Sequence, residues 1–361
     1  MIDDDWGLFY FESNGLAEII STIKTADICV PGYYPSQKGM YDSLSIAYEA
    51  WLEGKKFVLL PDRNVTNRLH RIQKGDYNSE DNQFKIAAAL LSFCQQLDIQ
   101  IEPSIAIHEL AHKVGNKEAW VELAGLRSAD NGNPKDWLEL GVGDTNKVKG
   151  SYKDYYEEVG DLAFPLHRWN RNYIQVLKIA EIDLYETSLK PQDKINKLIE
   201  WMYSDFMLSG PAAIFSAIFF APKKPPKSGM IKKLRSSNRE QALNGIKNAA
   251  WDLTYLSEFT KLINQDSIGE YRYIFASFDK TLRAIARSLI PPTLEIDPRE
   301  HTKSILSQWW PKQEAAEIVE TIFELQEIIN DRHWLSKRPS RKDYITFFIE
   351  KGESSIKNFS P

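Results

Sequence analysis

The sequence predicts an α/β protein, because short apolar segments typical of buried strands alternate with longer segments that have the apolar spacing of helices. The clearest strand is Phe57–Leu60, an apolar run without polar alternation, as expected for a strand buried on both faces of a parallel sheet. Further strands are predicted over 27–31, 99–102 and 271–276. At 361 residues, the chain is long enough for two or three compact parts.

Helices are predicted between and after these strands, and a less regular middle part interrupts the alternation. The predicted helices of the regular parts cover residues 41–52, 65–72, 84–97, a segment from 104 onward, 241–263 and a segment from 280 onward. The middle part contains polar loops, an aromatic-rich helical stretch over 152–201 and a basic segment, Lys223–Arg239. We therefore predict an N-terminal extension (1–54), a core in two parts (55–112 and 241–300), a mainly helical insertion (113–240) and a helical C-terminal extension (301–361).

Composition and charge favour a soluble cytoplasmic protein. The formal net charge of −5 means that a polyanionic partner would have to meet a local basic patch or a bound metal ion. The two cysteines, Cys29 and Cys94, are too few and too far apart for a disulfide framework or a zinc finger. The acidic N-terminus lacks the features of a signal peptide, and the apolar run Met207–Ala221 is too short to span a bilayer. We expect no membrane association.

Four acidic residues occupy comparable places along the predicted core. Asp62 follows the strand Phe57–Leu60, and Asp279 follows the strand at 271–276. Glu109 and Asp252 each lie on the apolar side of a predicted helix. Ligands of open parallel sheets bind beyond the carboxyl ends of the strands, so these acids are expected to converge there. Clustered carboxylates need a cation, and hard oxygen ligands select Mg²⁺ or Mn²⁺.

The segments that carry these acids resemble the motifs of PIN-domain nucleases. Leu59–Val65 (LLPDRNV) resembles the opening motif LLDTNV, and Ile101–Leu110 resembles the second acidic motif, which ends in an acid followed by leucine. Asn248–Leu253 is similar to the third acidic site, and Ile274–Lys280 to the fourth, which has the pattern (T/S)xD. The likeness covers roughly residues 57–112 and 241–295, with the helical insertion between them.

This resemblance implies a PIN-like, three-layer core around a parallel sheet, and a metal-dependent nuclease activity. It implies that the following residues are both catalytic and metal-binding: Asp62, Glu109, Asp252 and Asp279. The residues expected to contact substrate are Asn64, Ser277, Lys280 and Arg63. The implied reaction is hydrolysis of a phosphodiester, in RNA in preference to DNA, by a water activated by Mg²⁺ or Mn²⁺. A role as a bacterial toxin or defence protein, with a protein inhibitor or a homo-oligomer as partner, is compatible with it.

Two other functions remain open from the sequence. Residues 108–112 read HELAH, which matches the HExxH motif of zinc-dependent peptidases. In that interpretation His108 and His112 bind zinc and Glu109 activates water, but Asp62, Asp252 and Asp279 are left without a role. The third interpretation is a non-catalytic binding module on a PIN-like scaffold.

Structural roles are also open for the same residues. Asp62 and Asp279 each precede a predicted helix and are suited to cap it, and Asp252 is suited to a buried salt bridge. The basic segment Lys223–Arg239 is either a solvated loop or a phosphate-binding arm. Trp309 and Trp310 are expected to pack in the interior or to stack on bases.

Overall fold

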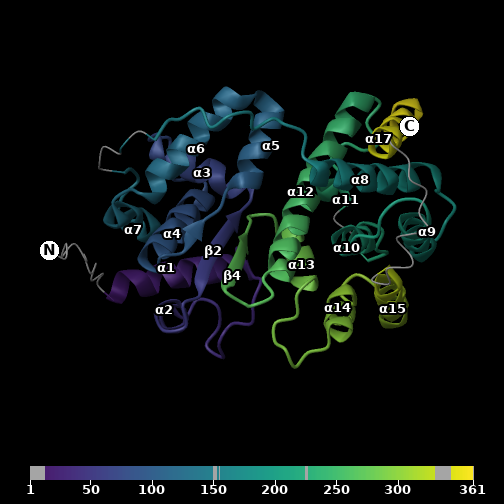
Figure 1. Ribbon diagram of the computed structural model, residues 1–361. Coiled ribbons are helices and arrows are strands. Elements are labelled where there is room, and N and C mark those ends of the chain that lie inside the picture. Colours follow the sequence, from purple (N-terminus) through teal and green to yellow (C-terminus); the bar gives the residue numbers. More distant parts are fainter. Residues whose placement is uncertain (1–12, 149–152, 154, 224–226, 330–342, 361) are drawn as a thin grey trace. The chain divides into compact units, whose positions relative to one another are not determined.

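The computed structural model describes residues 13–148, 153, 155–223, 227–329 and 343–360, which fall into two compact units (Figure 1). The first contains residues up to Phe164 together with Leu262–Lys280, and we call it the α/β unit because it holds the sheet. The second contains Pro165–Lys261 and Thr281–Pro361. We call it the helical unit, since its described segments are helices and their connections.

Every strand and helix predicted for the first 112 residues is present in the α/β unit, with small differences at the ends. In chain order the elements are α1 (Ser13–Ala26), β1 (Cys29–Pro31), α2 (Ser43–Trp51), β2 (Lys56–Pro61), α3 (Arg63–Gln73), α4 (Asn82–Gln96), β3 (Gln100–Ile101), α5 (Ser104–Val114), α6 (Asn116–Asp130), α7 (Pro134–Val142) and β4 (Tyr271–Ala276). The α/β class predicted from the sequence is therefore confirmed.

The sheet has four strands in the order β1-β4-β2-β3, and it is mostly parallel. The central strands β2 and β4 are parallel neighbours whose register pairs Pro61 with Ala276, as their adjacent arrows in Figure 1 illustrate. β3 is also parallel to β2, whereas β1 pairs antiparallel with β4 at the edge of the sheet. The expectation of a parallel sheet thus holds for three strands, and the three-layer PIN-like arrangement stays a prediction.

Burial of the central strands explains their uninterrupted apolar sequence. From Phe57 to Pro61 every residue of β2 is buried, because parallel strands in the middle of a sheet are covered on both faces. Phe57 and Leu59 of β2, with Ile274 and Ala276 of β4, belong to the same hydrophobic core as helices α1 and α3–α7. This core fixes the sheet from which the candidate site projects.

Helix α4 lies in the middle of this core and packs closely on α7. Ten of its residues, from Phe84 to Cys94, are buried. Gly141 of α7 lies so near to α4 that an added Cβ would lie 2.7 Å from the Cα of Ala89. The two helix backbones therefore approach each other at a point where only a hydrogen atom fits.

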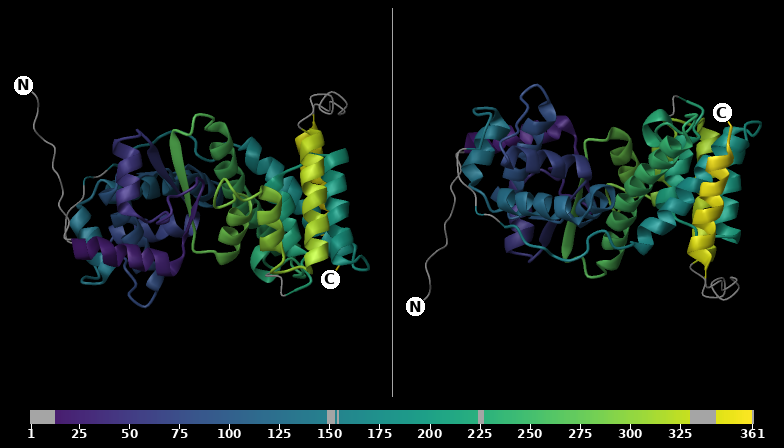
Figure 2. Two further views of the ribbon diagram at one scale, coloured as in Figure 1. Left: turned by 90° about the horizontal axis from the view of Figure 1, so that it is seen from below. Right: turned by 90° about the horizontal axis from the view of Figure 1, so that it is seen from above.

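The helical unit is built from α8 (His167–Tyr185), α9 (Pro191–Ser204), α10 (Gly210–Phe219), α11 (Lys227–Met230), most of α12 (Arg239–Gln265), α13 (Lys280–Ser288), α14 (Pro298–Leu306), α15 (Lys312–Ile329) and α17 (Tyr344–Asn358). Helix α17 packs against α8; Figure 2 shows the helices of this unit from two further sides, with α17 in yellow. Gly352 allows this approach, because an added Cβ would lie 2.9 Å from the Cβ of Leu177. The apolar run that contains α10 is buried, as predicted. Among the described helices, none has the length and apolarity required to cross a bilayer.

Several predicted segments of the middle part differ from the structure. The helical stretch expected over 152–201 is interrupted, since the described residues from 155 to 166 are not helical and α8 begins at His167. In the basic segment, Arg235 contacts Asp183, and Arg239 donates to the carbonyls of Leu234, Ser236 and Ile356. These two arginines therefore serve the helical unit itself. Trp310 is fully buried and donates to the carbonyl of Ala217, which favours its structural interpretation.

The division into units differs from the predicted domain boundaries. The predicted extension (1–54) contributes β1 to the sheet, and α6 and α7, expected in the insertion, pack in the core of the α/β unit. From the predicted second core part (241–300), only Leu262–Lys280 belongs to the α/β unit. The reason is that a segment joins the unit in which its apolar side chains are buried, which sequence spacing does not specify.

The close contact between α4 and α7 predicts that Gly141→Ala is destabilising. The added methyl group would overlap backbone atoms of α4, so we expect a loss of about 2 kcal/mol in the free energy of unfolding, measured in urea. The matched control is Gly210→Ala at the start of α10, where an added Cβ meets no atom within 4 Å. Equal stability of the two variants would contradict the packing described here.

Candidate functional site

The register of the two central strands brings Asp62 and Ser277 together at the carboxyl end of the sheet. Asp62 follows β2 directly, and its backbone N–H donates to the carbonyl of Ala276 at the end of β4 (2.9 Å). Ser277, the next residue after β4, donates its hydroxyl to the carboxylate of Asp62. Both residues are buried, at 3% and 0% exposure. Two residues far apart in sequence are thus in direct contact.

Asp62 is also the N-cap of α3. Its Oδ1 accepts hydrogen bonds from the backbone N–H groups of Asn64 and Val65, each at 3.1 Å. The capping role considered from the sequence is therefore confirmed, and it fixes the direction of the carboxylate. Because Ser277 contacts the other oxygen, both oxygens are held in place without a cation.

A short network of hydrogen bonds extends from Asp62 to Asp279. The Oδ1 of Asn64 accepts from the backbone N–H of Phe278 (3.1 Å), and the hydroxyl of Ser277 accepts from the backbone N–H of Asp279 (2.9 Å). The loop after β4 is thereby attached to the start of α3. Asp279 and the following Lys280 are exposed, so they border the opening of the site. The predicted residues Asn64, Ser277 and Asp279 do lie together with Asp62.

Glu109, on α5, is the third of the predicted acids that belong to the α/β unit. It is 6% exposed, and its carboxylate forms an ion pair with Lys113 one helical turn later (2.6 Å). Its negative charge acts on Asp62 and raises the pKa of that carboxyl. Lys113 was not among the predicted residues, although its spacing of four from Glu109 on a helix is a recognisable signal for such a pair.

Burial is the main cause of an unusual pKa at Asp62. Desolvation raises the pKa of Asp62 to about 7, and Glu109 adds to the rise. The hydrogen bonds from Ser277, Val65 and Asn64 act in the opposite direction and lower the pKa. The ionised form of Asp62 is therefore poorly stabilised near neutral pH, and a nearby cation would favour it.

Asp252 belongs to a different part of the molecule. It lies on α12, within the portion of that helix assigned to the helical unit, and it is half-buried. Asp252 takes part in at least one interaction, so it is not without a partner. The structure thus groups three of the four predicted acids in the α/β unit and carries the fourth on the helical unit.

Arg63, predicted to contact substrate, has a structural partner. Its guanidinium forms two hydrogen bonds with the carboxylate of Glu122 on α6, at 2.6 and 2.9 Å. Burial raises the pKa of Glu122, and the positive charge of Arg63 counteracts that rise. No pattern in the sequence points to Glu122, because the pair depends on how α3 packs against α6.

The two histidines of the HExxH sequence hold a segment of the chain that we call the strap, residues 155–164. The Nδ1 of His108 lies 2.7 Å from the carbonyl oxygen of Leu162, and the Nε2 of His112 lies 3.1 Å from that of Phe164. Asn116 also accepts from two strap N–H groups, and Trp120 donates to the carbonyl of Gly160. One nitrogen of each histidine is therefore engaged by the strap, while Glu109 pairs with Lys113.

The donor set fits a weakly coordinated divalent ion better than a closed metal cage. Within the described residues, no three His, Cys, Asp or Glu side chains form a metal-binding group. Mg²⁺, however, usually keeps several waters and is held by only one or two carboxylates together with substrate phosphates. Asp62 and Glu109 are the two carboxylates that would fit such an ion, because it would relieve their mutual repulsion.

Comparison of the chain with protein-family models, with curated proteins and with solved structures finds no match in any of the three. What the site does must therefore be judged from the chemistry of its own residues.

The raised pKa of Asp62 predicts a pH-dependent gain in stability for Asp62→Asn in the presence of a chelator. The folded pKa of about 7 exceeds the ordinary value of 3.8 for an aspartic acid, so the folded parent loses stability as the pH rises from about 4 to about 7. Asparagine carries no charge and can still cap α3, so the advantage of the variant should grow over this range to at most about 4 kcal/mol. Urea unfolding at pH 5 and pH 8 measures it. A gain that does not depend on pH would contradict the assignment.

The ion pair of Arg63 predicts a structural defect for Arg63→Met. Glu122 would remain buried without its cation, so we expect a loss of about 3 kcal/mol in the free energy of unfolding. The double variant Arg63→Met/Glu122→Gln should recover part of this loss, because no buried charge is left unpaired. If Arg63→Met keeps full stability and instead weakens RNA binding, the substrate-binding role predicted from the sequence would replace the structural one.

Proposed function

We propose that this protein is a nuclease dependent on Mg²⁺ or Mn²⁺ that hydrolyses phosphodiester bonds, with RNA as its substrate. The observation that carries the proposal is the carboxylate of Asp62. It is buried at the carboxyl ends of two parallel strands, oriented by three hydrogen bonds, and close enough to Glu109 for their charges to interact. Such a carboxylate lowers the stability of the fold. Binding of a cation would explain why the protein nevertheless has a carboxylate at this buried position.

Each residue of the α/β unit has a defined part in this proposal. Asp62 and Glu109 would hold the ion, and Asp279 at the exposed border of the site would complete its coordination or orient its waters. When bound, such an ion supplies an activated water and stabilises charge on the phosphate oxygens. Ser277 and Asn64 keep Asp62 and the loop after β4 in position, and Lys280 offers a positive charge for the phosphate backbone. Asp252 stays a predicted ligand.

The zinc-peptidase alternative finds less support in the same geometry. His108 and His112 each use a ring nitrogen for a carbonyl of the strap, and Glu109 is paired with Lys113. These contacts account for the HExxH residues without zinc. The proposal also includes a role as a bacterial toxin or defence protein, with an inhibitor protein as partner. This part of the proposal rests on the resemblance to PIN-domain nucleases alone.

Cleavage of labelled RNA tests the proposal. The parent protein with Mn²⁺ should cleave single-stranded RNA, and Asp62→Asn and Asp279→Asn should each reduce the rate by about 100-fold or more, because a charge that stabilises the transition state is removed. The matched control is Asp144→Asn, an exposed acid on the loop after α7. Equal rates for the parent, Asp62→Asn and Asp279→Asn would refute the nuclease proposal.

Metal binding can be followed in the same proteins without any substrate. An ion that binds only the folded state stabilises it by about 2.7 kcal/mol when its concentration is one hundred times the dissociation constant. Mn²⁺ should therefore raise the unfolding temperature of the parent and of Asp144→Asn, but not that of Asp62→Asn. An equal rise in all three would place the ion elsewhere.

A further inference from the structure

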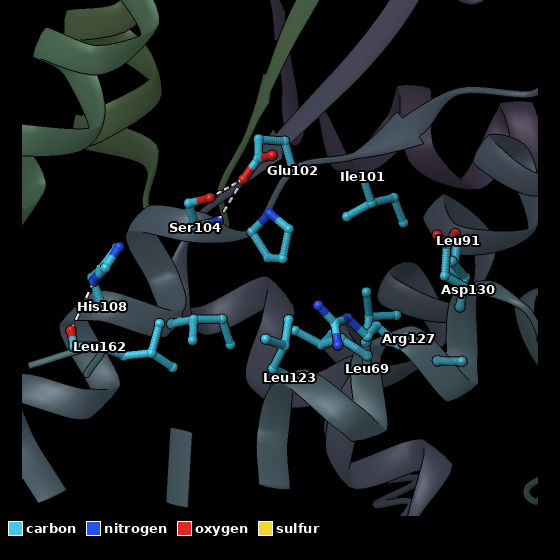
Figure 3. A pocket seen from close by; sticks show the side chains of 14 residues that line it. Leu69, Leu91, Ile101, Glu102, Ser104, His108, Leu123, Arg127, Asp130 and Leu162 are labelled. Carbon is cyan, nitrogen blue, oxygen red and sulfur yellow. Dashed lines mark hydrogen bonds between the residues drawn. The ribbon is translucent and has the colours of Figure 1, made fainter. Parts of the chain in front are cut away.

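The α/β unit contains a cavity of about 310 Å³ that none of the predicted catalytic residues lines. It lies between the end of β3, the first two turns of α5 and one side of α6, with Leu162 of the strap forming part of its wall (Figure 3). Its apolar lining comes from Leu69, Leu91, Ile101, Ile107, Leu123 and Leu126. This volume is at the lower end of the range found for small-molecule sites.

The polar groups at this cavity are mostly hydrogen-bond acceptors. They are Glu102, Ser104, His108, Arg127 and Asp130, and in Figure 3 the first three lie toward one end and Asp130 toward the other. A carbonyl oxygen can only accept, so the contact with Leu162 requires the proton of His108 on Nδ1 and leaves Nε2 as an acceptor when the ring is neutral.

Glu102 is held in place at the cavity without losing its capacity to accept further hydrogen bonds. Its Oε1 accepts from the backbone N–H of Ser104 (2.9 Å) and from the hydroxyl of the same residue. The contacts that are described leave its other oxygen available, and the side chain is exposed. Arg127 supplies hydrogen-bond donors instead. Among the described residues, Glu157 is the one acid that its guanidinium contacts, at 3.4 Å.

We propose that this cavity binds an unstacked guanine base of the nucleic acid, an inference that rests on the proposed nuclease function. An apolar slot whose lining includes the carboxylates of Glu102 and Asp130 disfavours a phosphate group but accommodates the flat face of a base. Sequence-specific recognition of single-stranded RNA commonly uses such a slot, with Arg stacking or hydrogen bonding to the base.

Guanine is the base whose edges match these side chains. Its N1–H and N2–H₂ groups are donors that suit the carboxylate of Glu102, and its O6 and N7 are acceptors that suit the guanidinium of Arg127. Uracil offers no amino group to a carboxylate, and adenine offers no carbonyl to a guanidinium. Cytosine has both groups, but its amino group and its acceptors lie on a single edge, so it cannot present a donor edge to Glu102 and a separate acceptor edge to Arg127. We therefore expect the cavity to prefer guanine over the other bases, because guanine presents a donor edge to Glu102 and an acceptor edge to Arg127.

The same helices build the cavity and the candidate site. Ile107 and His108 of α5 line the cavity, and the next residue is Glu109. Leu69 lines it from α3, the helix that Asp62 caps. A base held there would thus fix the position of the chain relative to Glu109 and Asp62, which gives cleavage a sequence preference.

Binding of short RNAs to the full-length Asp62→Asn protein tests this inference separately from cleavage. The probes are fluorescein-labelled oligouridylates that carry a single central G, A or C, with all-U RNA as the reference, and fluorescence anisotropy gives each dissociation constant. We expect the G-containing RNA to bind at least about fivefold more tightly than the other three, the lower limit for one bidentate contact.

Two variants in the Asp62→Asn background locate the effect. Glu102→Gln keeps an oxygen for Ser104 but presents an amide to the base, and Leu123→Trp fills the cavity; each should abolish the preference for G. Glu80→Gln, an exposed acid outside the cavity, should retain it. Equal binding of all four RNAs, or a preference that survives both cavity variants, overturns the inference. A G preference lost in both variants supports it even if the parent cleaves no RNA, in which case only the nuclease proposal fails.

Discussion

The parallel pairing of β2 with β4 is the constraint on which the candidate site depends. Its register places the ends of both strands level, so that Asp62 and Ser277, 215 positions apart in the chain, are joined by a hydrogen bond. The core beneath holds the register, because a shift of one residue would turn Phe57, Leu59 and Ile274 out of it. The geometry at the strand ends is therefore determined by packing that is distant from it.

The same site shows a conflict between stability and chemistry. A carboxyl group with 3% exposure and a pKa of about 7 is a cost to the folded protein near neutral pH. Three hydrogen bonds reduce this loss of stability and fix the side chain. They do not supply a positive charge, which would stabilise the buried carboxylate further. Strongly shifted pKa values cluster at functional sites, so the loss of stability at Asp62 supports a functional role for this carboxyl.

A short motif can have a physical explanation other than its most familiar one. The HExxH spacing places His108 and His112 on one side of α5, and in this protein that side faces the strap, whose carbonyls the histidines contact. Glu109 points to a different environment, where it meets Lys113 and acts on Asp62. The helical spacing that would bring two zinc ligands together thus directs the histidines to a structural contact. It directs Glu109, the candidate catalytic residue, to a different side of the helix.

The sequence alone determined the α/β class, the strands β2 and β4, the helices that follow them and the residues Asp62, Asn64, Ser277 and Asp279, because strand burial and helix starts leave local patterns. It did not determine the antiparallel β1, the partner of Arg63 or the interrupted stretch before α8. It also placed the unit boundaries elsewhere and grouped Asp252, which belongs to the helical unit, with three acids of the α/β unit. These features depend on which apolar surfaces bury one another across long sequence separations, and only the tertiary structure decides that.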